Sequence, residues 1–233
     1  MTRVSRLLAL ALSAVLLSAC ASTTSDANEG DPYVRAFRSV RPSVVLLTMK
    51  IPSDKKKGEW DDAFGSGLVV ASGDWGTQIA TEEHVIHGAR DLHVTYNEKT
   101  TAQARVAARD VKNDLALVET SATGLVPARL GISSRLEPGT QIGIAGFPIP
   151  DAFQDEGLGV ATSLYSGRVA AIRRDALELD APIIPGESGG PVFEVAGGTI
   201  VGLAESRFEE EPRIGFAIPI EEVKKFLSGK LHR

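Results

Sequence analysis

The stretch "APIIPGESGGPVFEV", residues 181–195, holds one serine among three glycines and runs directly into an apolar segment. Gly186, Gly189 and Gly190 can adopt backbone conformations that other residues avoid, so the stretch suits a tight turn. It equally suits a nucleophile, because a reactive hydroxyl must be presented beside free backbone N–H groups. The stretch alone leaves both interpretations of Ser188 open, and the rest of the chain has to decide between them.

The chain around this stretch has the pattern of an all-β protein. From Ser43 onward, short runs rich in valine, isoleucine and leucine alternate with breaks that contain glycine, proline or aspartate, and about twelve strands are expected. The clearest hairpin spans residues 191–204, where Gly197 and Gly198 are expected to form a two-residue turn. The one helix expected within this region lies at the end of the chain, at residues 220–230, where four apolar residues share one face: Ile220, Val223, Phe226 and Leu227.

The first 32 residues differ from this pattern. "MTRVSRLLALALSAVLLSAC" contains two arginines, an apolar run over residues 7–17, and small residues before Cys20, which is the layout of a secretory signal. The apolar run is too short for a transmembrane helix, which needs about 20 apolar residues. Residues 20–32 are polar and predict a flexible tether, and the folded domain is expected over residues 33–233. Tyr33 opens it with a short stretch of helical spacing that Pro42 ends.

"LSAC", residues 17–20, resembles the lipobox of bacterial lipoproteins, in which the cysteine is acylated and the leader, here residues 1–19, is removed. The alternative is a plain signal peptide that happens to contain a cysteine. The resemblance implies an exported protein held on the cell envelope by a lipid on Cys20, and Ala21 in second place favours the outer membrane of a diderm bacterium. Cys20 is the only cysteine, so the mature domain forms no internal disulfide.

The overall composition excludes some classes of function. The chain has 233 residues, 43% of them hydrophobic and 24% charged, which is ordinary for a folded protein of one large domain or two small barrels. Its formal net charge is −5, and loss of a leader that carries two arginines makes it more negative still. An acidic domain is a poor partner for nucleic acid, so no nucleic acid is expected among its partners.

A catalytic serine needs a base, a group that orients the base, and backbone donors for the oxyanion. Among the four histidines, His84 directly follows a strand at the start of a short helical turn, for which Thr81 is the expected N-cap. His87 and His93 are nearby alternatives, and any of the three could be a histidine without chemistry. For the orienting acid, two candidates stand before the buried run 115–118.

Those two candidates are Asp114, which leads directly into the run, and Asp110, four residues earlier. An aspartate at the edge of a buried strand can lose solvent beside an imidazole. Either aspartate could instead simply cap a turn.

Six motifs then occur in a fixed order: "GSGLVV" (65–70), "TEEHVI" (81–86), "NDLALV" (113–118), "GIAGFP" (143–148), "GESGGPV" (186–192) and "GFAIP" (215–219). Together they resemble the trypsin-like serine peptidases, most closely the bacterial HtrA/Deg branch, over the whole mature domain. The resemblance implies two six-stranded antiparallel β-barrels with a C-terminal helix and the active site at their interface. It also implies a serine endopeptidase without metal or cofactor.

By the same resemblance, Ser188 is the nucleophile, His84 the general base and Asp114 its orienter, and the N–H groups of Gly186 and Ser188 form the oxyanion hole. "GESGG" also matches the nucleophile elbow of α/β-hydrolases, but those enzymes place the acid and the histidine after the serine. Here no aspartate follows Ser188 and His232 lies at the very end, so the elbow is rejected.

The sequence departs from the HtrA pattern at two places. The chain ends soon after residue 219, so no PDZ domain is expected, and Glu187 stands where asparagine or aspartate is usual. The primary pocket is expected to be apolar, lined by Pro182, Ile183, Ile184, Leu203 and Ala204. Pro182 occupies the place of the acid that trypsins use to bind basic side chains.

Two functions of different classes remain. The first is an endopeptidase acting on proteins or peptides of the cell envelope. The alternative is a catalytically silent module that binds a partner protein. Retention of all three triad candidates favours the enzyme.

Overall fold

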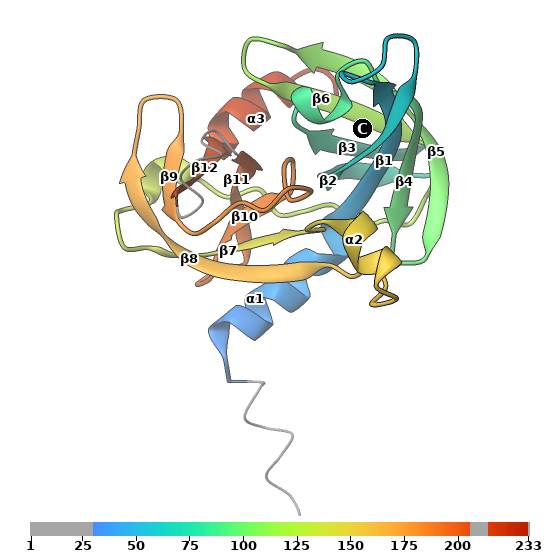
Figure 1. Ribbon diagram of the computed structural model, residues 1–233. Coiled ribbons are helices and arrows are strands. Elements are labelled where there is room, and N and C mark those ends of the chain that lie inside the picture. Colours follow the sequence, from blue (N-terminus) through green and yellow to red (C-terminus); the bar gives the residue numbers. More distant parts are fainter. Residues whose placement is uncertain (1–29, 206–213, 233) are drawn as a thin grey trace, which may run out of the picture.

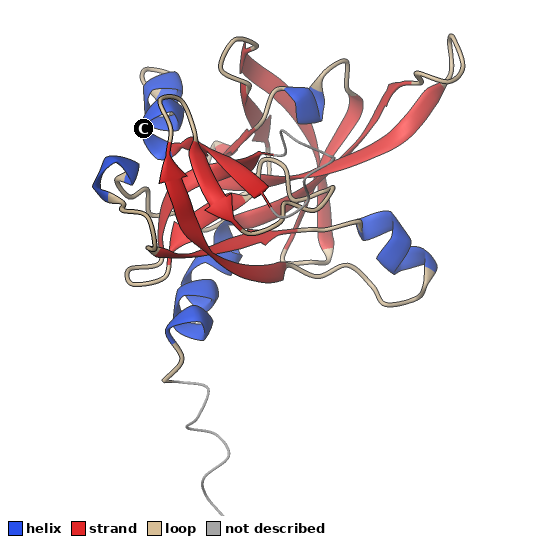
Figure 2. Cartoon of the chain, turned by 60° about the vertical axis from the view of Figure 1, so that its left-hand side comes forward, coloured by secondary structure: helices blue, strands red, loops and turns tan. Residues whose placement is uncertain are grey.

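A computed structural model describes residues 30–205 and 214–232. The chain forms two barrels side by side, with the helices on the outside (Figures 1 and 2). Each barrel is closed, has six antiparallel strands, and uses the same order of neighbours, so the expectation of two six-stranded barrels is confirmed. The first barrel, in the order β1-β2-β3-β6-β5-β4, consists of β1 (Val44–Pro52), β2 (Trp60–Gly73), β3 (Gly76–Thr81), β4 (Arg90–Tyr96), β5 (Thr100–Asp110) and β6 (Leu115–Thr120).

The second barrel repeats this topology in the order β10-β11-β12-β9-β8-β7. Its strands are β7 (Gln141–Gly146), β8 (Ser163–Ile172), β9 (Leu177–Asp180), β10 (Pro191–Glu194), β11 (Thr199–Glu205) and β12 (Ile214–Pro219). The helices are α1 (Pro32–Val40), α2 (Pro150–Asp155), α3 (Ile220–Leu227) and three short 3-10 turns, η1 (Arg41–Ser43), η2 (His84–Ile86) and η3 (Ser133–Arg135). No helix in the described ranges has the length and apolar character needed to cross a bilayer.

The apolar runs are continuous because several strands are buried on both faces. In β1, Val45 and Leu47 point into the first barrel, whereas Val44 and Leu46 join the layer between the two barrels. Side chains alternate along a strand, so a run of this kind supplies two cores at once. The interface between the barrels is therefore a buried apolar layer, and the loops at its edge are held firmly in relation to one another.

The helices agree with the sequence at the C-terminus and at the helical spacing before Pro42, where α1 lies, and differ at α2. The four apolar residues expected on one face of α3 are all buried. Two further helices are present: α1, capped by the Asp31 side chain, and the six-residue α2, which begins at Pro150. A proline at the first helical position is favourable, but α2 is too short to show a helical period in the sequence.

Two local expectations were wrong. The loop between β10 and β11 has four residues, and only Gly198 of its two glycines has a positive φ, 58°. Thr81 does not cap the turn at His84; its hydroxyl donates to the Ser66 carbonyl oxygen instead, at 2.8 Å. The second difference matters for the site, because it ties the end of β3 to β2.

The leader, the tether and the expected lipidation at Cys20 lie outside the described residues.

Candidate active site

His84, Asp114 and Ser188 come from three separate loops at the boundary of the barrels. His84 opens the turn η2 after β3, and Asp114 stands directly before β6, which pairs with β3. Ser188 lies in the loop between β9 and β10 of the second barrel. The Ser66 N–H donates to the Ser188 carbonyl oxygen at 2.9 Å, so the serine loop is bound to β2 of the first barrel. The fold therefore brings these distant segments together.

His84 is held by Asp114 through two hydrogen bonds. The His84 backbone N–H donates to Asp114 Oδ1 at 2.8 Å, and ring atom Nδ1 lies 2.7 Å from Oδ2. A carboxylate only accepts, so the proton sits on Nδ1 and the lone pair sits on Nε2. The hydrogen bond to Asp114 raises the pKa of His84, although burial opposes it. Burial acts to raise the pKa of Asp114, but the hydrogen bonds from His84 outweigh it and the pKa is lowered.

The alternative residues are engaged elsewhere. Asp110 accepts from the Asn113 backbone N–H and side-chain amide, as a turn-capping aspartate does. His87 points to solvent and contacts Glu83, and the ring of His93 contacts the Asp91 carbonyl oxygen. Among the candidate histidines and aspartates, only His84 and Asp114 are hydrogen-bonded to each other.

The serine loop carries two backbone N–H groups without acceptors. Residues 184–187 form a turn closed by the Glu187 N–H and the Ile184 carbonyl oxygen, 2.9 Å, and Gly186 has φ +98°. The Pro185 carbonyl oxygen accepts from the Ile149 N–H, so the Gly186 N–H points the opposite way across the same peptide plane. Among the described residues, neither this N–H nor that of Ser188 has an acceptor. Two free donors flanking a serine are what an oxyanion site requires.

Ser66 is a site residue that the sequence analysis did not single out. Its fully buried hydroxyl donates to the Gly186 carbonyl oxygen at 2.6 Å and accepts from the Phe147 N–H at 3.0 Å. One hydroxyl thus fastens the Gly186 turn to both barrels. The motif "GSGLVV" contained the residue, but a hydrogen bond across 120 positions leaves no local signal in the sequence.

Glu187, which departs from the family pattern, is fully buried behind this turn. Its Oε2 accepts from the Ile184 N–H at 2.8 Å, and Oε1 has no partner among the described residues. Burial raises the pKa of Glu187 to about 7, with the Ile184 hydrogen bond acting in the opposite direction. Glu187 therefore stabilises the turn through the hydrogen bond that it accepts from Ile184.

A second buried acid, Glu82, also escaped the sequence analysis. It is fully buried, and its Oε2 lies 3.9 Å from His84 Nε2. Burial, and then the charges of Asp114 and Glu205, raise the pKa of Glu82 well above its usual value. The Ser188 hydroxyl lies near this carboxyl group but forms no regular hydrogen bond with it or with His84. The only signal in the sequence was the pair of acids immediately before His84.

The expected pocket residues do not all lie together. Ala204 packs with Ala217 in the core of the second barrel, and the partly buried Ile183 packs against this cluster. Leu203, on the opposite face of β11, points into the layer between the barrels, so it does not share a surface with Ala204. Pro182 is exposed.

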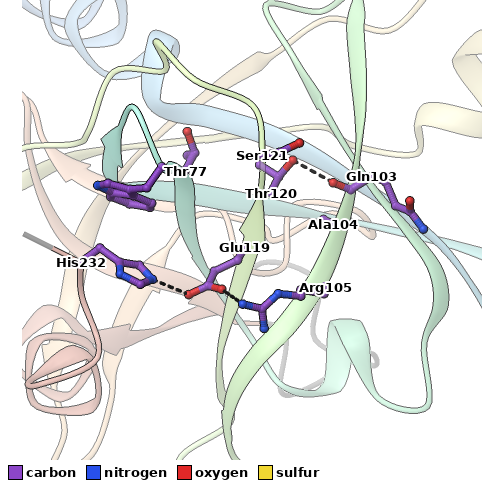
Figure 3. Close-up of a pocket in the computed structure, with 9 residues that line it drawn as sticks. Thr77, Gln103, Ala104, Arg105, Glu119, Thr120, Ser121 and His232 are labelled. Carbon is purple, nitrogen blue, oxygen red and sulfur yellow. Dashed lines mark hydrogen bonds and ion pairs between the residues drawn. The ribbon is translucent and has the colours of Figure 1, made fainter.

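One hollow among the described residues lies on the first barrel, away from the expected pocket residues. It has a volume of about 630 Å³ and lies beside Trp75, β5, β6 and the C-terminal segment (Figure 3). Within it, Glu119 contacts both Arg105 and His232. The Arg105, Glu119 and His232 side chains thus contact one another, and none of the expected site residues lies in this hollow.

A double antiparallel barrel whose interface joins a histidine–aspartate pair to a glycine-flanked serine defines the class of the trypsin-like peptidases. A family model for the trypsin-like peptidase domain matches residues 65–203. The chain belongs to this family.

The relatives within the family are serine proteases of the HtrA/Deg type. The chain is 31% identical to the chloroplast Protease Do-like 1 of Arabidopsis thaliana over 213 residues, which cover 82% of this chain and 45% of that protein. It is 28% identical to a probable periplasmic serine endoprotease DegP-like of Halomonas elongata, over 73% of this chain and 35% of that one. A serine endoprotease structure from Yersinia pestis matches with a TM-score of 0.69 and 27% identity, over 84% of this chain and 65% of that one. The chain thus spans less than half the length of these two curated relatives.

Proposed function

We propose that the chain is a serine endopeptidase in which Ser188 attacks the peptide carbonyl and His84 is the general base. The observation that carries the proposal is the pair of hydrogen bonds from His84 to Asp114, because it fixes the proton on Nδ1 and leaves Nε2 able to accept a proton. The free N–H groups of Gly186 and Ser188 support it, since they are available to the oxyanion.

The reaction follows from these roles. Nε2 of His84 takes the Ser188 proton as Oγ attacks, and Asp114 stabilises the imidazolium that forms. The two loop N–H groups receive the negative charge of the tetrahedral intermediate. His84 then returns the proton to the leaving amine, and water hydrolyses the acyl-enzyme by the same steps in reverse roles. All of these groups belong to the protein, so the mechanism calls for no metal or cofactor.

Proteins or peptides of the cell envelope are the proposed substrates. The support is the likeness to periplasmic DegP-like proteases together with the signal layout of the first 20 residues. A lipid on Cys20 would tether the domain to the membrane. Labelling of the wild type with radioactive palmitate, and its loss in Cys20→Ser, tests this anchor; an unlabelled wild type would leave a plain secretory signal.

A serine-reactive fluorophosphonate probe tests the activity itself. The wild-type chain should be labelled, and Ser188→Ala should not. His84→Ala should also lose labelling, whereas His87→Ala, which removes only a solvent-facing ring, should keep it. A folded wild-type protein that resists the probe would support the alternative, a silent module that binds a partner.

A further inference from the structure

The Glu82 carboxyl group is buried with few polar partners. The residue follows β3 directly and is fully buried, yet neither carboxyl oxygen has a hydrogen-bond partner of regular geometry among the described residues. The Gly189 N–H and the Ser188 hydroxyl lie close enough to favour its ionised form, but less than burial disfavours it. Burying a carboxyl group without partners is costly, so unpaired groups of this kind call for an explanation. The mechanism above does not use Glu82.

The surroundings of Glu82 are negative. Asp114 and Glu205 are close enough to disfavour its ionisation, and Arg109 pairs with the adjacent residue, Glu83. A buried carboxyl group beside the lone pair of an imidazole is a suitable position for a small cation, because both groups can donate an electron pair to it. Glu82, His84 and Asp114 each offer a ligand atom within 4.8 Å of the other two.

We propose that His84 Nε2 and Glu82 form a binding site for Zn²⁺. Zinc binds nitrogen and oxygen at about 2.0–2.1 Å in tetrahedral geometry, which places two ligand atoms about 3.3 Å apart. The observed separation of Nε2 and Oε2 is 3.9 Å. A modest rotation of the imidazole, whose side chain is half exposed, closes this gap, and water completes the coordination.

Asp114 does not bind the zinc ion itself, but orients the His84 ring that does. Both of its oxygens already accept hydrogen bonds from His84. A zinc-bound histidine usually donates its other ring N–H to a carboxylate, which orients the ring and increases its basicity. The Asp114–His84 pair therefore presents the geometry of a carboxylate–histidine–zinc arrangement, with Glu82 as the second protein ligand.

Zinc at this position regulates the proposed peptidase. The ion occupies the Nε2 lone pair that would accept the Ser188 proton, so the zinc-bound protein cannot activate its nucleophile. This consequence rests on the proposed function, whereas the binding itself does not. Removal of zinc by a chelator should restore activity in full.

Calorimetric titration of ZnCl₂ into the full chain tests the site without using activity. The wild type should bind one Zn²⁺, and both Glu82→Gln and His84→Ala should lose at least tenfold in affinity. His87→Ala is the matched control, because His87 and Glu83 form a neighbouring histidine–glutamate pair on the surface; it should keep the wild-type affinity. Unchanged binding by Glu82→Gln, or loss of binding by His87→Ala, overturns the proposal.

Two further measurements remove ambiguity. Zinc should slow fluorophosphonate labelling of the wild type, and failure of the probe without zinc would count against the proposed function alone. If Glu82→Gln does not fold, as judged by circular dichroism, zinc-edge anomalous diffraction from wild-type crystals decides the case. A peak between His84 Nε2 and Glu82 supports the site, and a peak only elsewhere rejects it.

Discussion

The carboxylate of Asp114 accepts two hydrogen bonds from His84, one from the ring at 2.7 Å and one from the backbone N–H at 2.8 Å. In Asp114→Asn, an amide NH₂ facing Nδ1 would favour the opposite tautomer, with the proton on Nε2. We expect kcat to fall about 10³–10⁴-fold with the fold retained, as for the corresponding change in trypsin. Steady-state hydrolysis of a peptide substrate, measured with a chelator present, checks this.

Asp110→Asn is the matched control for this change. It removes a carboxylate four residues away that accepts from Asn113 and not from His84. Its kcat should stay within about twofold of the wild type, as for a surface change away from the site. Equal losses in the two variants would mean that the effect is structural and would remove Asp114 from the mechanism.

Gly186 is expected to be irreplaceable for both stability and rate. Its φ of +98° is unfavourable for any residue with a Cβ, and a Cβ there would overlap the Phe147 carbonyl oxygen. Gly186→Ala should therefore displace the turn that carries the first oxyanion donor. Loss of one such donor lowers kcat about 10²–10³-fold.

Gly139→Ala separates backbone strain from the clash. Gly139 has a similar φ, +94°, but no atom lies within 4 Å of the place that an alanine Cβ would take. Its cost should be that of a left-handed residue alone, about 1–2 kcal/mol, with kcat unchanged. Urea unfolding should show a larger loss of unfolding free energy for Gly186→Ala than for Gly139→Ala. Equal losses in the two variants would contradict the clash with the Phe147 carbonyl oxygen.

The sequence predicts the strands well because their signal is local, whereas their closure into two barrels was implied only by the family resemblance. Runs such as 44–49 alternate with turn residues, and each strand can be found without knowledge of the others. His84 and Asp114 each stand at the edge of a strand, so they could be proposed from their surroundings. The contact between them could not be measured until the pairing of β3 with β6 was known.

Ser66 and Glu82 show where local reasoning ends. The Ser66 hydroxyl acts on Gly186 in the other barrel, and the burial of Glu82 depends on residues brought together only by the fold. A glutamate after a strand ordinarily predicts an exposed side chain. Glu187 is a second glutamate that is fully buried although it lies in a loop.

Glu187 should make stability depend on pH. Burial raises its pKa from 4.5 to about 7, so the folded state holds this proton more tightly than the unfolded state does. The stabilisation that the protonated Glu187 carboxyl group contributes is therefore present in full below about pH 4.5. It is lost as the pH rises to about 7, by about 3 kcal/mol. Glu187→Gln cannot ionise and should lack this loss.

Urea denaturation at about pH 5 and about pH 8, on either side of most of this loss, measures the effect. From about pH 5 to about pH 8, the free energy of unfolding should fall more for the wild type than for Glu187→Gln. Glu137→Gln, a change of the same chemistry at an exposed position, should follow the wild type at both. A stability difference between Glu187→Gln and the wild type that stays constant with pH would show that Glu187 does not hold a proton in this range.

The last prediction concerns the side chain accepted before the scissile bond. Pro182 stands six residues before Ser188, where trypsins carry the acid that binds basic side chains, and Asp180, two residues earlier, is exposed at the end of β9. Ile183 instead packs against the apolar cluster that contains Ala204 and Ala217. Burying an unpaired charge against such a surface would cost several kcal/mol. We therefore expect cleavage after valine, alanine or isoleucine, with arginine and lysine disfavoured. The preference should be broad, since one or two methylenes change binding by only about 1–3 kcal/mol. Profiling with a peptide library measures it, and a dominant preference for basic residues would mean that an acid reaches the pocket after all.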